Sequence, residues 1–295
     1  MLLVFASATY FNDSIKGIDS YSIFTEKPNI EYELKSDDND NSLGKLSYQP
    51  VISSFLGLSA TANDISLSFV YQNEDDENES IQESTLFDIQ LEGVYKKSLW
   101  SLFYQNYQGL YITDSEIASD LPQANSWNYG FGIKYFTNDS YNPKHSLKNF
   151  SLKKETNWSW IQGMSINRFK LFSSNTLIPP QFTNFNQLNG LSAFQSTSLI
   201  YDLGITGMFG YKQFFIDSLM TLGLQIQNQE FEGLDQESRV ITDSAVGFSL
   251  NTGYQVTDNS SLGIKTSFQS IGVPIKNARY TSTRSVVRVY YKHFF

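Results

Sequence analysis

Residues 284–295 read RSVVRVYYKHFF, and this stretch decides the fold. Successive side chains of a β-strand point to opposite faces. One face here is apolar and aromatic: Val287, Val289, Tyr291 and, after a break at His293, Phe295. The other face carries three cations: Arg284, Arg288 and Lys292. Such a strand suits a wall with lipid on one side and water or packed polar groups on the other.

The same period-two alternation recurs along the chain, whereas helical spacing is almost absent. It is clear in six further segments: residues 65–72, 87–96, 127–135, 220–227, 246–254 and 262–269. Their minor face is rich in Gly, Ser, Asn and Gln, where a soluble sandwich would carry more Lys, Glu and Thr. Small polar side chains on that face indicate a narrow polar lumen.

The connections between strands alternate between short turns and longer polar loops. Outer-membrane barrels have short periplasmic turns and long extracellular loops, so the alternation gives each strand a direction. A first strand at 28–36 and a return strand at 43–60, bent at Pro50, bring the total to twelve, with ten or fourteen as alternatives. One long connection, 138–156, falls on the predicted periplasmic side. We therefore expect an all-β fold, a single up-and-down antiparallel transmembrane β-barrel over residues 28–295.

The composition agrees with this fold. The chain has no Cys, which excludes disulfides and thiolate metal sites. Aromatic residues make up 15 % of the chain and charged residues only 17 %, below the ~25 % of an average soluble domain. No stretch approaches the ~20 apolar residues of a membrane-spanning helix. The net charge of −9 and the lack of a basic stripe argue against nucleic-acid binding.

Three segments are expected to lie outside the barrel wall. Residues 1–27 are interpreted as a signal-peptide remnant and a periplasmic lead, because residues 6–8, Ala-Ser-Ala, have the form of a cleavage site. An ordinary apolar tail is the alternative. The acidic runs at 37–40 and 74–79 read as solvated loops, since neither has the Gly and spaced acids of a calcium-binding EF-hand loop.

Strand parity predicts which charges face inward, because a cation on the lipid face near the midplane costs ~2–4 kcal/mol. The predicted lumen charges are Glu31, Glu33, Asp88, Glu92, Lys134, Asp202, Lys265, Arg284, Arg288 and Lys292. Closure of the barrel would bring the acids of the first strand beside the cations of the last. Two interpretations stay open: a salt-bridge network that fills a small lumen, or a water-filled path that selects solutes by charge.

No catalytic constellation, cofactor site or metal site is expected. The two histidines, His145 and His293, lie in a polar connection and near the membrane edge of the last strand, away from any predicted outer rim. The Gly-x-Ser-x-Gly, P-loop and His-Glu-x-x-His patterns are absent. Trp158 and Trp160 are interpreted as part of an interfacial aromatic girdle.

The longest predicted outer loop holds an apolar, proline-containing run: Leu177, Ile178, Pro179, Pro180, Gln181 and Phe182. Proline fixes its backbone dihedral and stiffens such a loop. We expect this run either to fold into the barrel mouth as a constriction or to cap the top of the barrel.

Several segments together resemble an uncharacterised barrel family of Bacteroidetes-type bacteria, catalogued as domain of unknown function 4421. They are LSYQP at 46–50, FDIQL at 87–91, FYQNYQGLY at 103–111 and LIP at 177–179. The terminal Phe295 is similar to the C-terminal signal by which bacterial outer-membrane barrels are inserted. The resemblance implies a barrel in the bacterial outer membrane, with the barrel-assembly machinery as its partner during insertion. We expect this barrel to be a monomer whose other partner is outer-membrane lipid. The resemblance implies no catalytic residues.

The sequence thus predicts a non-enzymatic outer-membrane barrel with a structural role or a role as a passive or gated conduit for small solutes. The alternative is a surface docking or adhesion protein that uses its acidic extracellular loops.

Overall fold

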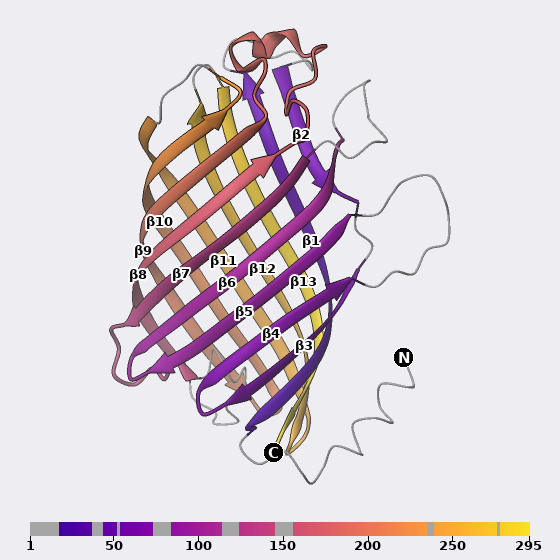
Figure 1. The fold of residues 1–295 in the computed structure, drawn as a ribbon. Coiled ribbons are helices and arrows are strands. Elements are labelled where there is room, and N and C mark those ends of the chain that lie inside the picture. The colour runs from indigo at the N-terminus through magenta and orange to yellow at the C-terminus, as the bar shows by residue number, and fades with distance from the viewer. Residues whose placement is uncertain are drawn as a thin grey trace, which may run out of the picture.

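The chain folds into one closed antiparallel barrel (Figure 1). The computed structural model describes residues 18–36, 44–51, 54–72, 84–113, 124–144, 156–234, 239–275 and 278–295. These residues form thirteen strands, listed in chain order: β1 Ser20–Ser36, β2 Lys45–Pro50, β3 Phe55–Ala62, β4 Ile65–Gln72, β5 Thr85–Tyr95, β6 Ser98–Ile112, β7 Ala124–Phe136, β8 Asn157–Phe172, β9 Ala193–Tyr211, β10 Phe214–Glu232, β11 Arg239–Thr257, β12 Ser260–Ile275 and β13 Ala278–Phe294. The predicted up-and-down barrel is confirmed.

The first and last strands close the ring along their whole length. The β1–β13 ladder runs from Ser20 opposite Phe294 to Ser36 opposite Ala278. The first strand therefore begins at Ser20, ahead of the predicted start at residue 28. The sequence hid this start because residues 25–29 read TEKPN, which carries no apolar alternation. A fully paired closing strand leaves no open sheet edge, as a barrel in lipid requires.

The number of strands in the wall changes along the barrel axis. The first half of β1, Ser20 to Glu26, pairs with β3, whereas Tyr32 to Lys35 pair with β2. Near the turns the ring thus runs through β3, β4 and β5 to β6 and has twelve strands. Farther up, β2 pairs directly with β6 and the ring has ten strands. The predicted return strand at 43–60 is therefore two strands, β2 and β3, with different partners on the far side.

A β-bulge lies at the point where β6 changes its partner from β5 to β2. Gly109 has φ 77°, a left-handed conformation that glycine adopts without steric cost, and the β6–β7 register shifts there. The Ser84 hydroxyl donates to the Gly109 carbonyl and accepts from the Val51 amide at 2.9 Å. The Gly109 amide donates to Asn125 Oδ1 at 2.9 Å. One buried serine therefore joins the ends of β2 and β5 to β6.

The two ends of the barrel differ, and we call them the turn end and the loop end. Two-residue turns such as Asn63-Asp64 and the C-terminus lie at the turn end, the lower end in Figure 1. The connections after β1, β6, β8 and β10 lie at the loop end, whereas the one between β7 and β8 lies at the turn end as predicted. The acidic runs at 37–40 and 74–79, His145 and residues 1–17 lie outside the described residues.

The outer face carries a belt of exposed apolar side chains. Members of this apolar belt on nine strands are Leu58, Leu67, Phe131, Ile166, Leu203, Leu222, Phe248, Ile264 and Val289. Exposed aromatics gather at its turn-end border: Tyr95, Tyr135, Trp158, Trp160, Tyr211, Phe214 and Tyr254. Polar outward residues of β1, Thr25, Lys27 and Asn29, interrupt the belt where β1 changes partner. A continuous apolar surface of this kind is stable against acyl chains rather than water.

Candidate functional site

The lumen is crossed by an ion pair between strands that are not neighbours in the ring. Arg284 of β13 reaches Asp88 of β5, with Nη2 to Oδ2 at 2.6 Å. The Asp88 carboxylate also accepts from Gln105 Nε2 at 2.9 Å and from Gln90 Nε2 at 3.2 Å. Asp88 is fully buried and Arg284 largely so. A buried carboxylate with several donors is satisfied, so this group braces the lumen rather than destabilising it.

A second ion pair ties the closing seam from inside. Arg288 of β13 donates from Nε and Nη2 to Glu26 Oε2 on β1, at 3.0 and 2.7 Å. The guanidinium also lies 3.8 Å from the centre of the Phe24 ring. Glu26 and Arg288 are direct ladder partners. The seam therefore has opposite charges on its two strands, as closure of the barrel predicts. The acid that takes part is Glu26, however, and not Glu31 or Glu33.

The expectation that Glu31 and Glu33 face the lumen is wrong. Both carboxylates lie on the outer face, where Lys45 Nζ is 3.9 and 3.2 Å away and Ser47 donates to Glu31 at 2.7 Å. Their neighbours Ile30, Tyr32 and Leu34 point inward and are buried. The parity rule assumed that apolar side chains of β1 face lipid over its whole length. Beyond the apolar belt the outer face is in water, so the pattern inverts.

Other charged side chains at the loop end also lie on the outer face, above the apolar belt. Lys170 Nζ lies 2.6 Å from Glu232 Oε1, and Gln195 donates to Glu230 at 2.8 Å. Together with Glu31, Glu33 and Lys45, these side chains form a polar collar around the loop end of the barrel. The collar stands above the membrane-facing belt, and apolar side chains fill the barrel at its level.

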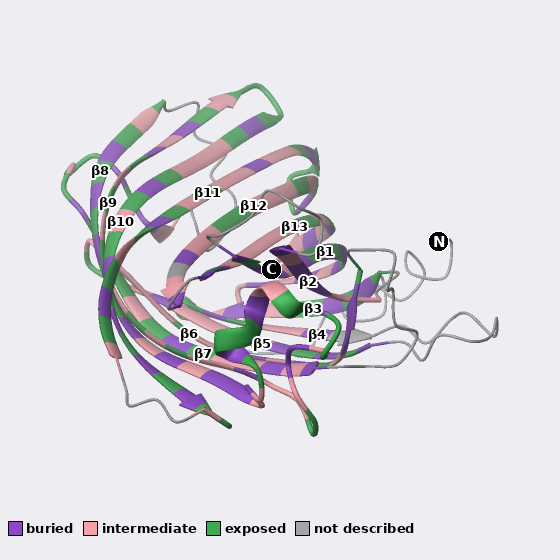
Figure 2. Ribbon diagram, turned by 90° about the horizontal axis from the view of Figure 1, so that it is seen from above, coloured by how far each residue is buried: buried purple, intermediate pink, exposed green. Residues whose placement is uncertain are grey.

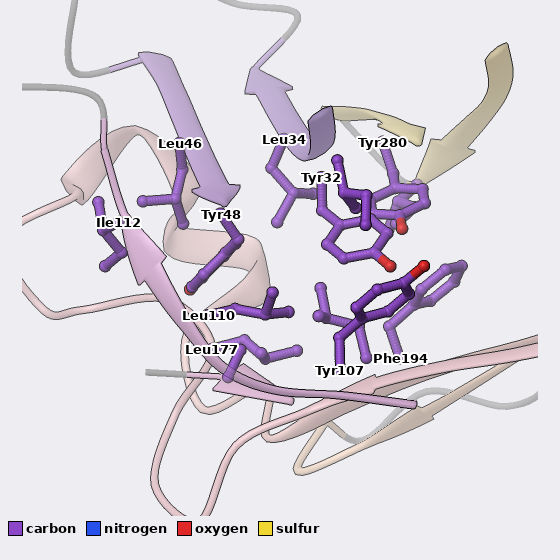
Figure 3. Close-up of a cluster of buried hydrophobic side chains, with 14 of the residues drawn as sticks. Tyr32, Leu34, Leu46, Tyr48, Tyr107, Leu110, Ile112, Leu177, Phe194 and Tyr280 are labelled. Atoms are coloured by element: carbon purple, nitrogen blue, oxygen red, sulfur yellow. The ribbon is translucent and has the colours of Figure 1, made fainter. Parts of the chain in front are cut away.

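The connection between β8 and β9, residues 173–192, caps the loop end. It contains the 3₁₀ helix η2, Thr183–Leu188, which lies across the mouth in the view from above (Figure 2). Its apolar side chains are all buried: Leu177, Ile178, Phe182, Phe185, Leu188 and Leu191. They join one core with side chains of β1, β2 and β6, among them Leu34, Tyr48 and Leu110 (Figure 3). Of the predicted run, Pro180 and Gln181 stay exposed at the surface of this cap.

Backbone contacts fix the cap to the strands around it. The Leu177 amide donates to the Leu191 carbonyl at 2.6 Å and closes the loop on itself. The Ser192 amide donates to the Glu232 carbonyl at 2.9 Å, and the Ser36 hydroxyl to the Asn184 carbonyl at 3.4 Å. Of the two predicted arrangements, the loop thus caps the barrel, with its apolar side chains directed into the mouth.

Four rings beneath the cap separate it from the polar lumen, and we call them the aromatic roof. Tyr280 lies 5.2 Å from Phe194, 5.8 Å from Phe169 and 6.3 Å from Tyr32, between ring centroids. Their separations are typical of attractive aromatic pairs. The Tyr32 hydroxyl is 3.0 Å from the Ser126 hydroxyl.

Two neighbouring cavities lie below the aromatic roof. The upper chamber, of about 190 Å³, reaches from the roof residues Phe169 and Tyr280 to Arg284. The lower chamber, of about 300 Å³, continues toward the turn end. Both are lined by the same middle group: Glu92, Ser101, Phe103, Asn167, Gln269 and Arg284. The lumen below the cap is therefore polar and holds space that side chains do not fill.

Several predicted lumen charges line the lower chamber. Glu92, Lys134 and Asp202 contribute to its wall beside Arg284, so acids and cations alternate there. The Asp202 carboxylate lies against Gly163, where a Cβ atom would overlap it. Glycine at this position keeps the carboxylate in place by leaving room for it.

The remaining predicted charges, Lys265 and Lys292, occupy the inner face nearer the turn end. Lys265 is the direct ladder partner of Arg288, and Lys292 is buried. Asp217, which the sequence reading missed, lies in the same row as Lys265 with Asn251 between them. The alternation of 220–227 continues to Asp217 and would have identified it.

A smaller apolar cluster forms part of the floor of the lower chamber. Tyr141, from the connection after β7, stacks on Phe136 with 5.1 Å between ring centroids. Its hydroxyl lies 3.2 Å from Thr206 Oγ1. Leu99 and Leu219 pack against this cluster and also line the lower chamber. The long turn-end connection thus places one aromatic residue inside the barrel.

The C-terminal residues lie on the outer face at the turn end. His293 contacts the Tyr21 ring in a tilted arrangement and the Phe295 ring edge-on, with centroids 5.5 and 5.2 Å apart. The Phe295 amide donates to the Asp19 carbonyl at 3.1 Å. Among the described residues no group of three metal-ligating side chains is close enough to hold a metal ion. No helix in the described part of the chain is long and apolar enough to cross a membrane.

Comparison with known proteins identifies similar solved structures but no sequence family. No family model matches the chain, and no curated protein matches it. The outer membrane protease OmpT from Escherichia coli is 9 % identical, with a TM-score of 0.44 over 96 % of this chain and 99 % of that one. The translocator domain of the autotransporter NalP from Neisseria meningitidis is 11 % identical, with a TM-score of 0.42 over 100 % and 94 %.

A third similar structure is the toluene transporter TodX from Pseudomonas putida, 8 % identical, with a TM-score of 0.30 over 96 % of this chain and 90 % of that one. The structures that resemble this chain are thus outer-membrane β-barrels.

Proposed function

We propose that this protein is a gated conduit for small polar solutes in the outer membrane of a Gram-negative bacterium, seen here with its outer gate closed. The observation that carries the proposal is the pair of neighbouring polar chambers beneath an apolar cap built from a single connection, residues 173–192. A barrel with a purely structural role has no need for a lumen lined by charges and open space. We infer further that the protein is not an enzyme.

The apolar belt supports the membrane location. Its side chains are exposed over nine strands and would collect into a large apolar surface in water. The inward ion pairs support the same orientation of the wall, since charges are tolerated in the lumen and not on the lipid face. Long loops of such barrels are extracellular, which puts the cap and the polar collar outside and the C-terminus in the periplasm.

The burial of the cap supports a gate that is closed at rest. Full burial of one large aliphatic or aromatic side chain is worth ~1.5–3 kcal/mol relative to exposure. Leu177, Phe182, Phe185 and Leu188 are all at most 3 % exposed. Lifting the whole cap therefore costs several kcal/mol, and spontaneous opening is rare. A solute or partner that binds the cap in its lifted position would shift this balance.

Removal of the cap tests the proposal. We would replace residues 176–190 by a short Gly-Ser linker and measure the conductance of the purified full-length protein in planar bilayers. The wild type should be mostly silent, and the shortened variant should show frequent openings. The exposed cap residue Gln187 offers a matched control, and Gln187→Asp should stay silent.

A correctly folded shortened variant that never conducts would overturn the conduit and leave the structural role. Folding of each variant is checked by its heat-shifted migration on gels.

A further inference from the structure

The upper chamber has an unusual concentration of carboxamide side chains. Six of them line its wall: Gln90, Gln105, Asn128, Asn167, Gln227 and Gln269. Four serine hydroxyls complete the polar lining. A carboxamide offers both hydrogen-bond donors and acceptors, and a hydroxyl does the same. The wall therefore matches a solute whose own groups both donate and accept.

Some of these polar groups are buried without a partner. Gln227 is 0 % exposed, and neither its Nε2 nor its Oε1 has a hydrogen-bond partner among the described residues. Asn167 Oδ1 and Arg284 Nε are in the same state. The neighbouring Gln225 donates from Nε2 to the Gly272 carbonyl at 2.9 Å, while its Oε1 also has no hydrogen-bond partner among the described residues. Buried polar groups without partners are uncommon in folded proteins. Those in the chamber wall are candidates for hydrogen bonds to a bound solute.

The chamber wall carries charges of both signs. Among the residues that the structure describes, the charged side chains that line it are Glu92 and Arg284, one acid and one cation. The Arg284 guanidinium is already bonded to Asp88 through Nη2. An added anion would meet the negative potential of Glu92 and Asp88, and an added cation would meet Arg284. The chamber therefore favours a neutral solute.

The roof of the chamber supplies an apolar surface. Phe169 and Tyr280 line its loop end, and Phe103 lines its side. Ring faces beside hydrogen-bonding groups suit a molecule with an apolar C–H face and a polar edge. The cavity volume of about 190 Å³ suits a small solute.

We propose that the upper chamber binds one small neutral polyhydroxylated solute, of the monosaccharide class. Gln227 and Asn167 hydrogen-bond its hydroxyl groups, and Phe169 and Tyr280 contact its C–H face. The solute reaches the chamber from the lower chamber, with which it shares Asn167 and Arg284. This inference deepens the proposed conduit function, because it names the solute class, but binding itself does not require the cap to open.

Equilibrium binding to the full-length protein in detergent micelles tests the site. The probes are glucose, N-acetylglucosamine, alanine as a zwitterion and inorganic phosphate, each followed by calorimetry and by ligand-detected NMR. We expect at least one of the two sugars to bind, and alanine and phosphate not to. Gln227→Leu should weaken sugar binding at least about fivefold, the effect of one or two lost neutral hydrogen bonds.

Gln229 provides a matched control. It lies two residues along β10 on the same inner face, is equally buried and has an amide equally without partners, but it does not line the chamber. Gln229→Leu should bind sugar as the wild type does. Ser196→Ala, a smaller change in the chamber wall, provides a second variant if Gln227→Leu fails to fold.

Binding of alanine or phosphate in place of sugar, absence of all binding, or equal loss in the Gln227 and Gln229 variants would overturn the site. Sugar binding with a silent cap-deletion variant would instead keep the site and remove the conduit, so the two failures can be told apart.

Discussion

The ion pair at the closing seam allows a quantitative test of the inward charges. Glu26→Gln keeps the size of the side chain and removes its charge. Arg288 then stays inside the barrel without its acid, with only 18 % of its side chain exposed. Removing one partner of a buried ion pair costs ~3–5 kcal/mol, because the other charge is left uncompensated. The contact of Arg288 with the Phe24 ring is retained and offsets part of this. We expect a loss of about 3 kcal/mol.

Glu31→Gln is the matched control on the same strand. Glu31 is on the outer face, 27 % exposed, and 3.9 Å from Lys45. Exposed ion pairs are worth about 0–1 kcal/mol, so its loss should be small. The sequence alone placed Glu31 inside the barrel. That placement predicts the opposite result, in which Glu31→Gln loses more stability than Glu26→Gln.

The assay is urea unfolding of the protein in lipid vesicles, followed by tryptophan fluorescence, with stability taken from the midpoint and slope. The double variant Glu26→Gln with Arg288→Met should recover part of the loss, because no unpaired cation remains. Equal stability of the Glu26 and Glu31 variants, within about 0.5 kcal/mol, would refute the buried seam pair.

Three further predictions use the same unfolding assay or bilayer recording. Leu222→Arg, in the middle of the apolar belt, should cost ~2–4 kcal/mol, whereas Val240→Arg near the loop-end border should cost ~0–1 kcal/mol. Gly57→Ala should cost ~1–3 kcal/mol because its new methyl group overlaps an inward aromatic ring, while Gly207→Ala, with no atom closer than 3.9 Å, should be close to neutral. Leu177→Asp places a charge in the fully buried cap core and should produce channel openings that the wild type rarely shows.

The barrel architecture could be predicted from the sequence because contact with lipid requires the apolar face of each strand to point outward. Wherever a strand crosses the apolar belt, its larger apolar residues must face out, so period-two alternation fixes both the strand and its orientation. The inward direction of Arg284 and Arg288 came from this rule. So did the placement of Asp88, which belongs to a strand whose outward neighbours are Phe87 and Ile89.

The rule failed where the strands leave the belt. Glu31 and Glu33 stand in water beside Lys45, and the cap supplies an apolar interior that a sequence pattern does not locate. Alternation with a period of two shows that the two faces of a strand differ in polarity. Which face points inward depends on whether the outer surface at that level contacts lipid or water. The seam acid Glu26 was missed because Pro28 and the polar residues around it carry no alternation. In the structure this stretch lies where β1 changes from β3 to β2 among the described residues.

The chambers were the part least accessible to sequence reasoning. Gln90 and Gln105 come from the neighbouring strands β5 and β6, whereas Gln227 comes from β10, far along the chain, and only the ring brings it to the same cavity. The abundance of Gly, Ser, Asn and Gln indicated a narrow lumen, but not where that lumen is empty. The family resemblance and the insertion role of Phe295 stay predictions.

The exchange of partners at Gly109 sets the aperture of the barrel. Barrel diameter grows roughly in proportion to strand number, so ten strands at the rim in place of twelve reduce the cross-section by about a third. The β4–β5 hairpin is what the rim lacks, and its length determines how far up the wider tube extends. A longer hairpin that reached the rim would part β2 from β6 and widen the mouth that the twenty residues between β8 and β9 now cover. Pore width and plug size in this molecule are therefore coupled through one hairpin.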